Sequence, residues 1–209
     1  MPVSEAPELA CFELLLRLAG RLPDRQLWRL RDWLASGALP ELSQTLPLTL
    51  LRERIGLTAG ELRLIATALL PHGADAGLIS SLQEVDDVPE LNYTFTSSGP
   101  GSPSLGDPLA VLLGAVLRGR TTVGDVRTCW RRSESDGAQK RVLLVTASTH
   151  WIALTGELQR IQCAMGEHDP CVEVLPADIE PPPYHWAAFE ASQLLCTGDV
   201  YASSQLGHS

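Results

Sequence analysis

One stretch of the sequence constrains the fold more than any other: residues 141–177 have the pattern of a strand, a helix and a second strand. Residues 142–146 carry a run of apolar side chains, which is typical of a strand covered on both faces. Apolar residues then recur at helical spacing over 151–165, and residues 171–175 predict a second strand. A strand–helix–strand unit of this length is normally parallel and right-handed, so this stretch predicts an α/β fold.

The remaining sequence predicts how this unit is embedded. In residues 1–88, apolar residues at helical spacing alternate with glycine and proline stops, which predicts a helical bundle. Residues 89–209 predict a small three-layer α/β domain with about three parallel strands. Within this domain, the Gly-, Ser- and Pro-rich residues 97–106 predict a flexible connector. The expected fold is therefore α/β, mostly helical overall, with the bundle preceding the α/β domain.

Several individual elements follow from local patterns. Thr58 and Glu61 have the spacing of a capping box, which predicts that a helix begins there. Residues 108–117 contain no polar side chain, so we expect a helix buried on most sides. A second helix is expected over 122–132, and a further one begins at the prolines that precede Tyr184 and runs to Leu195.

The charge of the chain limits the partners it can have. The formal net charge is −9, which argues against a general binder of nucleic acid or of anionic membranes. The charge is unevenly spread, because residues 118–160 carry eight basic groups and four acids, while residues 161–209 carry acids alone. The simplest interpretation is that these charges lie on solvated faces of one globular protein. The sharper interpretation is a basic patch that meets an acidic partner or pairs with the acidic ends of the same chain.

The cysteine pattern and the short apolar runs indicate the cellular compartment of the protein. There are five cysteines and no CxxC motif, which favours reduced, mostly buried thiols in a cytoplasmic protein. The first residues have no basic segment of a secretory signal, and no apolar run approaches the length of a membrane span. Cys163, His168 and Cys171 lie within nine residues, but a structural zinc ion normally needs four ligands. We therefore predict a cytoplasmic protein with no membrane association and no metal.

The turn that joins the first strand of the unit to its helix is the first candidate site. Ser148, Thr149 and His150 would lie at the carboxyl end of a strand and at a helix N-terminus, where anions are favoured. Ser148 and Thr149 are accordingly candidate ligand-binding residues. However, the turn lacks the glycines that nucleotide-binding loops need, and the simpler interpretation is that Ser148 or Thr149 caps the helix. We predict no cofactor.

A catalytic site is the second possibility. His150 and His185 both follow expected strand ends, so Ser148, His150 and His185 form a candidate catalytic set. The sequence has no GxSxG nucleophile elbow, and the spacing matches no known triad. The alternative interpretation is that His185 and its aromatic neighbours are ordinary packing and surface residues. The sequence leaves catalysis open and favours a protein that is not an enzyme.

The third possibility is DNA binding. Residues 107–132 have the outline of a helix-turn-helix, in which Arg127, Arg131 and Arg132 would face phosphate groups. The same three arginines are candidates for contact with an acidic protein. The acidic surroundings of this segment make nucleic acid the less favoured partner.

We therefore predict a cytoplasmic, non-catalytic regulatory or protein-interaction protein that binds another protein, with an oligomeric state that the sequence does not determine. One alternative is a small α/β enzyme or ligand-binding protein with an anion-accepting site at the strand carboxyl ends. The other is a DNA-binding regulator that uses residues 107–132.

Overall fold

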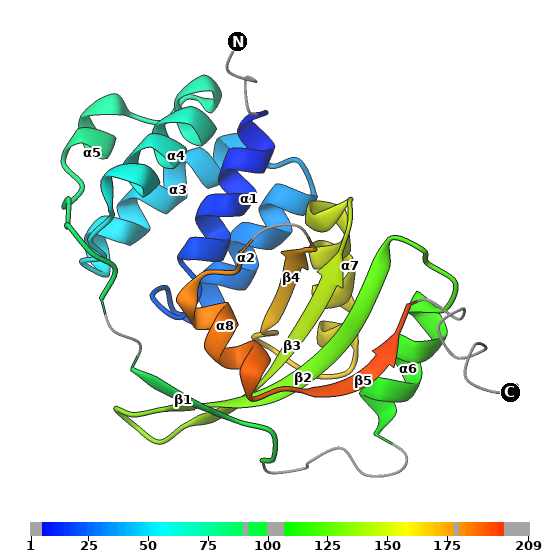
Figure 1. Ribbon diagram of the computed structural model, residues 1–209. Coiled ribbons are helices and arrows are strands. Elements are labelled where there is room, and N and C mark those ends of the chain that lie inside the picture. Colours follow the sequence, from blue (N-terminus) through cyan, green and yellow to red (C-terminus); the bar gives the residue numbers. More distant parts are fainter. Residues whose placement is uncertain (1–5, 90–91, 100–106, 178–179, 199–209) are drawn as a thin grey trace, which may run out of the picture. The chain divides into compact units, whose positions relative to one another are not determined.

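The computed structural model describes residues 6–89, 92–99, 107–177 and 180–198. In this part of the chain there are eight α-helices and a mixed five-stranded sheet, which confirms the α/β class (Figure 1). The residues cluster into two compact units, Met1–Leu91 and Asn92–Ser209. The sequence placed a domain boundary between residues 88 and 89. Of the predicted connector 97–106, residues 100–106 lie outside the described part.

The first unit consists of helices. Its capping box is confirmed: Thr58 Oγ1 accepts a hydrogen bond from the Glu61 amide at 3.3 Å, and Glu61 Oε2 accepts one from the Thr58 amide at 2.9 Å. The other carboxylate oxygen of Glu61 lies 2.6 Å from the guanidinium of Arg21, whose side chain is mostly buried. The Glu61 side chain therefore takes part both in the capping box and in an ion pair with Arg21. The helices are α1 (Pro7–Arg17), α2 (Asp24–Ala35), α3 (Leu39–Arg52), α4 (Ala59–Leu69), a 3₁₀ turn (Leu70–His72) and α5 (Ala76–Ser80).

The second unit contains the sheet, in the order β1-β2-β3-β4, with β5 also paired to β2. The prediction of about three parallel strands is wrong, because β3 and β4 form the one parallel pair in the described sheet. A short turn joins β2 to β3, and a connection this short forces an antiparallel pair, whereas α7 carries the chain back for β4. The elements are β1 (Tyr93–Thr96), α6 (Pro108–Leu117), β2 (Val123–Ser133), β3 (Gln139–Ala147), α7 (Trp151–Ala164), β4 (Val172–Pro176), α8 (Pro183–Glu190) and β5 (Gln193–Thr197).

The helix predicted over 122–132 is wrong: this segment is β2, the strand with the most neighbours. The pairing register of β2 with β3 shifts between Val123 and Val126, where Gly124 and Asp125 form a bulge. The bulge places two buried valines three residues apart on the same face, which imitates helical spacing. The helix-turn-helix interpretation of residues 107–132 therefore has no second helix.

The helix predicted to run to Leu195 is also too long. The structure ends α8 at Glu190, and the following residues form β5, which pairs antiparallel with β2. In this strand Leu194 is exposed, whereas Leu195 and Cys196 are both partly buried against the core, and the sequence interpretation extended the helix as far as Leu195. A possible short strand at residues 200–201 lies outside the described part.

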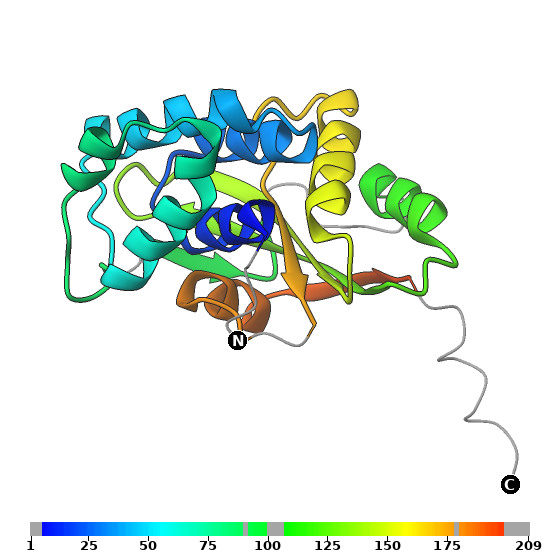
Figure 2. The same ribbon diagram turned by 90° about the horizontal axis from the view of Figure 1, so that it is seen from above.

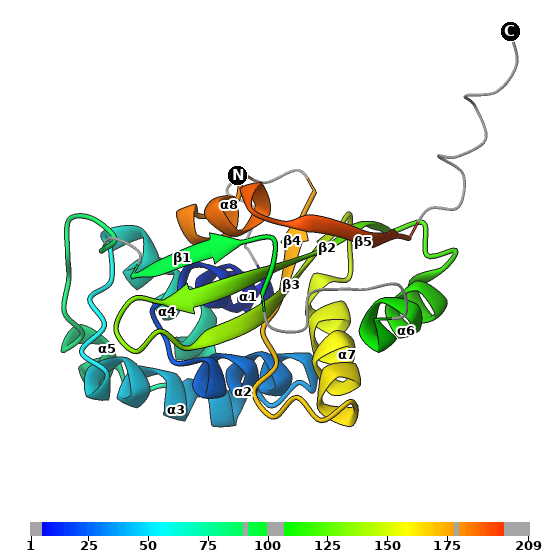
Figure 3. The ribbon, with the colours of Figure 1, turned by 90° about the horizontal axis from the view of Figure 1, so that it is seen from below.

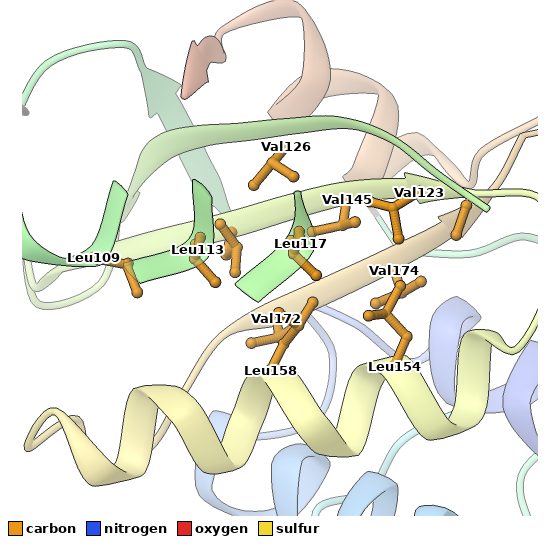
Figure 4. Packing of buried hydrophobic residues seen from close by; sticks show 12 residues of the cluster. Leu109, Leu113, Leu117, Val123, Val126, Val145, Leu154, Leu158, Val172 and Val174 are labelled. Atoms are coloured by element: carbon orange, nitrogen blue, oxygen red, sulfur yellow. The ribbon is translucent and has the colours of Figure 1, made fainter. Parts of the chain in front are cut away.

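The second unit has three layers. Helices α6 and α7 cover one face of the sheet and α8 covers the other (Figures 2 and 3). The main core lies between the sheet and the two helices α6 and α7, where leucines of the helices meet valines of the strands (Figure 4). The buried residues of this core are Leu109, Leu113, Leu117, Val123, Val126, Leu143, Val145, Ala147, Leu154, Leu158, Val172 and Val174.

Candidate functional site

The strand–helix turn lies where the sequence predicts it, but its details differ. The residue that precedes α7 as N-cap is His150, with a left-handed backbone (φ 59°) and no capping hydrogen bond from its side chain. The amide of Ser148 instead donates to the carbonyl of Thr122 at 2.9 Å. The interpretation of Ser148 or Thr149 as the helix cap is therefore wrong. Ser148 and His150 are exposed, and Thr149 is half-buried.

His185 lies in different surroundings from His150. It is on α8, fully buried, and its Nε2 is 2.7 Å from Oε2 of Glu173, which is fully buried on β4. Helix α8 covers the sheet face opposite to α7, the helix that His150 begins (Figure 2). The candidate catalytic set Ser148, His150 and His185 is thus divided between an exposed turn and a buried position.

A cluster of buried polar and aromatic side chains surrounds this pair beneath α8. Arg131 of β2 donates a hydrogen bond to the hydroxyl of Tyr184 at 2.9 Å, and its guanidinium lies 4.5 Å from the ring centroid of Tyr93. The ring of Phe95 packs edge-on against Tyr184 at 5.3 Å, and Cys171 Sγ lies 3.8 Å from the Tyr184 hydroxyl. The cluster thus joins residues from β1, β2, β4 and α8.

The chemistry of this cluster is that of a closed, paired interior. Burial, with the neighbouring Cys171 as a smaller contribution, raises the pKa of the Cys129 thiol to about 12. A thiol with such a pKa is protonated at neutral pH and is a poor nucleophile. Glu173 and His185 share one hydrogen bond, as buried ionisable groups normally do, while Nδ1 of His185 is buried without a partner in the described residues. We conclude that the arrangement fixes α8 on the sheet.

The three arginines considered for partner binding do not form one face. Because side chains alternate along a strand, Arg127 and Arg131 point to the α8 side of the sheet and Arg132 points away from it. Arg131 is buried, as described above. Arg127 donates to Ser192 Oγ at 2.8 Å and lies 3.3 Å from a carboxylate oxygen of Asp125. Two of the three are thus engaged within the unit.

Other basic groups of the 118–160 stretch also pair with acids of the same unit. Arg120 binds both carboxylate oxygens of Glu157 at 2.7 Å, and this contact lowers the pKa of the Glu157 carboxyl. Lys140 lies 3.7 Å from Glu167. Glu157 lies within the basic stretch itself, whereas Glu167 belongs to the acidic segment 161–209, so one of these two pairs has the form expected for pairing with an acidic end of the chain.

Helix α6 is buried along one side only. Buried side chains form one stripe of three leucines, Leu109, Leu113 and Leu117, so the expectation of burial on most sides is wrong. The opposite side of the helix is in solvent: Val111 is 66% exposed and Leu112 37% exposed. Ala115, one turn beyond Val111, is exposed as well. We call Val111, Leu112 and Ala115 the outer face of α6.

Both ends of α6 are fixed by ion pairs. Asp107 accepts a hydrogen bond from the Leu109 amide at 3.1 Å and forms a 2.5 Å ion pair with Arg141 of β3. The hydrogen bond from Arg141 lowers the pKa of the Asp107 carboxyl. Beyond the helix, Arg120 holds Glu157 of α7. The outer face is therefore presented on a helix that is held at both ends.

The sequence contained the signal for this surface, because a ten-residue helix without one polar side chain has no side that suits water. A single helix that packs on one sheet buries only the side chains that face the sheet. The apolar composition of α6 was therefore compatible with exposed apolar side chains on its other side as well as with burial.

No family model, no curated protein and no solved structure matches this chain. In the described part of the chain, no three His, Cys, Asp or Glu residues lie close enough together to hold a metal ion. Cys163 is exposed on α7 whereas Cys171 is buried, and all five cysteines are free thiols. None of the described helices is long and apolar enough to cross a bilayer.

Proposed function

We propose that this protein is a non-catalytic regulatory protein of the cytoplasm that binds another protein through the outer face of α6. The exposed valine and leucine on a helix with no polar side chain support this proposal. Contiguous apolar side chains in solvent mark contact sites on soluble proteins. The ion pairs at both ends of α6 favour binding, because a surface that is already ordered loses less entropy when a partner binds.

The occupant that fits this face is a helix of a partner protein with an acidic residue beside its apolar stripe. Gly114 and Ala115 are small, so the axis of a second helix can approach α6 closely. Arg118, exposed at the C-terminal end of α6, provides a positive charge for that acidic residue. The outer face covers less than three helical turns, a size that fits the small contacts of transient signalling complexes.

The two alternatives receive less support. The enzyme alternative requires Ser148, Thr149, His150 and His185 to act on one ligand, yet His185 is buried beneath α8 against Glu173. The DNA-binding alternative requires a second helix where β2 lies. The arrangement of these residues therefore favours neither alternative.

The experiment compares which proteins co-purify with the wild-type chain and with two variants. Val111→Glu places a charge on the outer face, and because Val111 is a surface residue we expect its effect on stability to stay within about 0.5 kcal/mol. Leu48→Glu, at a leucine of α3 that is 54% exposed, is the matched control. We expect a stoichiometric partner with the wild type and with Leu48→Glu, and its loss with Val111→Glu.

Two results would contradict the proposal. One is a partner that all three proteins retain equally, because the contact would then lie elsewhere. The other is a wild-type dimer, measured by light scattering, that Val111→Glu dissociates, because the face would then belong to a second copy of this chain.

A further inference from the structure

A cavity of about 310 Å³ lies between α2 and α3 of the helical unit. This volume is at the lower end of the range for small-ligand sites. It is formed by residues at helical spacing on two facing helices. The lining residues are Arg25, Gln26, Arg29, Leu30, Trp33, Thr45, Thr49 and Arg52. We call this cavity the α2–α3 groove.

Three arginines line the groove, and within the described residues only one of them is paired with a carboxylate. Arg25 and Arg29 lie one turn apart on α2, and neither forms an ion pair with any carboxylate in the described residues. Arg52 of α3 is paired with Glu53 at 3.1 Å, and Glu53 also accepts a hydrogen bond from Gln26 at 3.0 Å. Two guanidinium groups therefore remain available to an anion, and a third stands at the same groove with one carboxylate beside it.

The other lining groups complete a site for a small molecule. The guanidinium of Arg29 lies 5.6 Å from the ring centroid of Trp33, so the indole orients this cation as well as forming an apolar wall with Leu30. Thr45 and Thr49 supply hydroxyl groups from α3. Gln26 Oε1 is buried and has no hydrogen-bond partner within the described part of the chain.

We propose that the α2–α3 groove binds a small phosphate monoester, with its phosphate on Arg25 and Arg29 and its organic part against Trp33. A carboxylate is satisfied by one bidentate arginine, whereas a phosphate monoester carries up to two charges and three acceptor oxygens. Arg25 and Arg29, which have no carboxylate partner in the described residues, and the hydroxyl groups of Thr45 and Thr49 provide enough positive charge and hydrogen-bond donors for a phosphate.

A long polyanion suits the groove less well than a small ester. The chain has a net charge of −9, and acids equal arginines in number over residues 1–63. Screening at physiological salt confines the attraction of the groove to about 8 Å. A small ester lies wholly within that distance, whereas a nucleic acid strand extends onto acidic surface. This site is independent of α6, which belongs to the other unit.

The test uses the full-length protein and follows the indole N–H signal of Trp33 by NMR, assigned with Trp33→Phe. The probes are adenosine monophosphate, ribose 5-phosphate, inorganic phosphate and, as the uncharged reference, adenosine. We expect the two esters to shift the Trp33 signal in a saturable way and adenosine to leave it unchanged. Saturation by inorganic phosphate as tightly as by the esters would overturn the role given to the organic part.

Two variants locate the site. Arg29→Gln removes one phosphate contact, and a lost charge-assisted hydrogen bond reduces affinity at least about tenfold. Arg63→Gln, at an exposed arginine of α4 outside the groove, is the control and should bind like the wild type. The proposal is wrong if no ester shifts the signal, if Arg29→Gln binds as tightly as the wild type, or if an acidic peptide binds and the esters do not.

Discussion

The buried Glu173–His185 pair allows a quantitative prediction about stability. Glu173→Leu removes the only hydrogen-bond partner of the His185 side chain in the described structure, where Nδ1 of this histidine is buried without a partner. Breaking a buried pair by removing one partner costs about 3–5 kcal/mol. In the single variant the imidazole of His185 stays buried without its carboxylate partner. The double variant, Glu173→Leu with His185→Leu, removes that imidazole as well. We therefore expect the double variant to be more stable than Glu173→Leu alone.

The assay is urea unfolding followed by amide NMR signals of β3 and β4, which report on the α/β unit separately from the helical unit. Glu134→Leu, at an exposed glutamate of the β2–β3 turn, is the control, with an expected change within about 0.5 kcal/mol. A loss below about 1 kcal/mol for Glu173→Leu would refute the argument that this pair fixes α8. A double variant no more stable than the single variant would refute it as well.

Three further predictions follow from local structure. Iodoacetamide should label the exposed Cys163 in the native protein, and Cys129, whose pKa burial raises to about 12, only after unfolding, as read by mass spectrometry. Asp107→Asn should destabilise the α/β unit by about 1 kcal/mol or more at pH 7, because asparagine can still cap α6 but lacks the carboxylate charge that pairs with Arg141. Because the folded pKa of Asp107 is lowered, this difference should vanish as pH falls through that pKa, in urea midpoints measured from pH 7 to pH 2. His150→Val should cost about 1–3 kcal/mol in the same unfolding assay and His150→Asn much less, because a left-handed backbone disfavours a β-branched side chain.

The parts of the fold that depend on nearby residues could be predicted. The apolar runs of β3 and β4 and the helical spacing of α7 all lie within 38 residues, Gln139–Pro176, so this segment can be recognised from the sequence. The capping box is a local contact between Thr58 and Glu61, and the structure contains both of its hydrogen bonds. In these cases the residues that determine the structure lie in the same short window of sequence.

Helix α3 shows how burial of side chains against distant residues can outweigh the tendency of proline to end a helix. Local rules favour a break at Pro47, between helical segments at roughly 39–46 and 48–54, because proline has no amide hydrogen to donate within a helix. The structure has one helix, α3, with Pro47 inside it. Leu42, Leu46 and Leu50 lie fully buried along one side, and this burial offsets the cost of the proline, about 3 kcal/mol.

The remaining differences arise from contacts between distant segments. The β2 bulge has helical spacing, and β2 is recognisable as a strand only through its partners β1, β3 and β5. Glu173 was not selected as a candidate, because its link to His185 depends on where α8 crosses the sheet. The exposure of Val111 depends on which stripe of α6 meets the core. Sequence periodicity contains none of this information.

The most direct test of the proposed function is photo-crosslinking in the living cell from position 111, with a photoreactive phenylalanine in place of Val111. The same amino acid in place of Leu48, on the helical unit, is the reference. The proposal predicts that position 111 crosslinks to one defined protein other than this chain, and that position 48 does not. No adduct from position 111, or the same adducts from both positions, would contradict it.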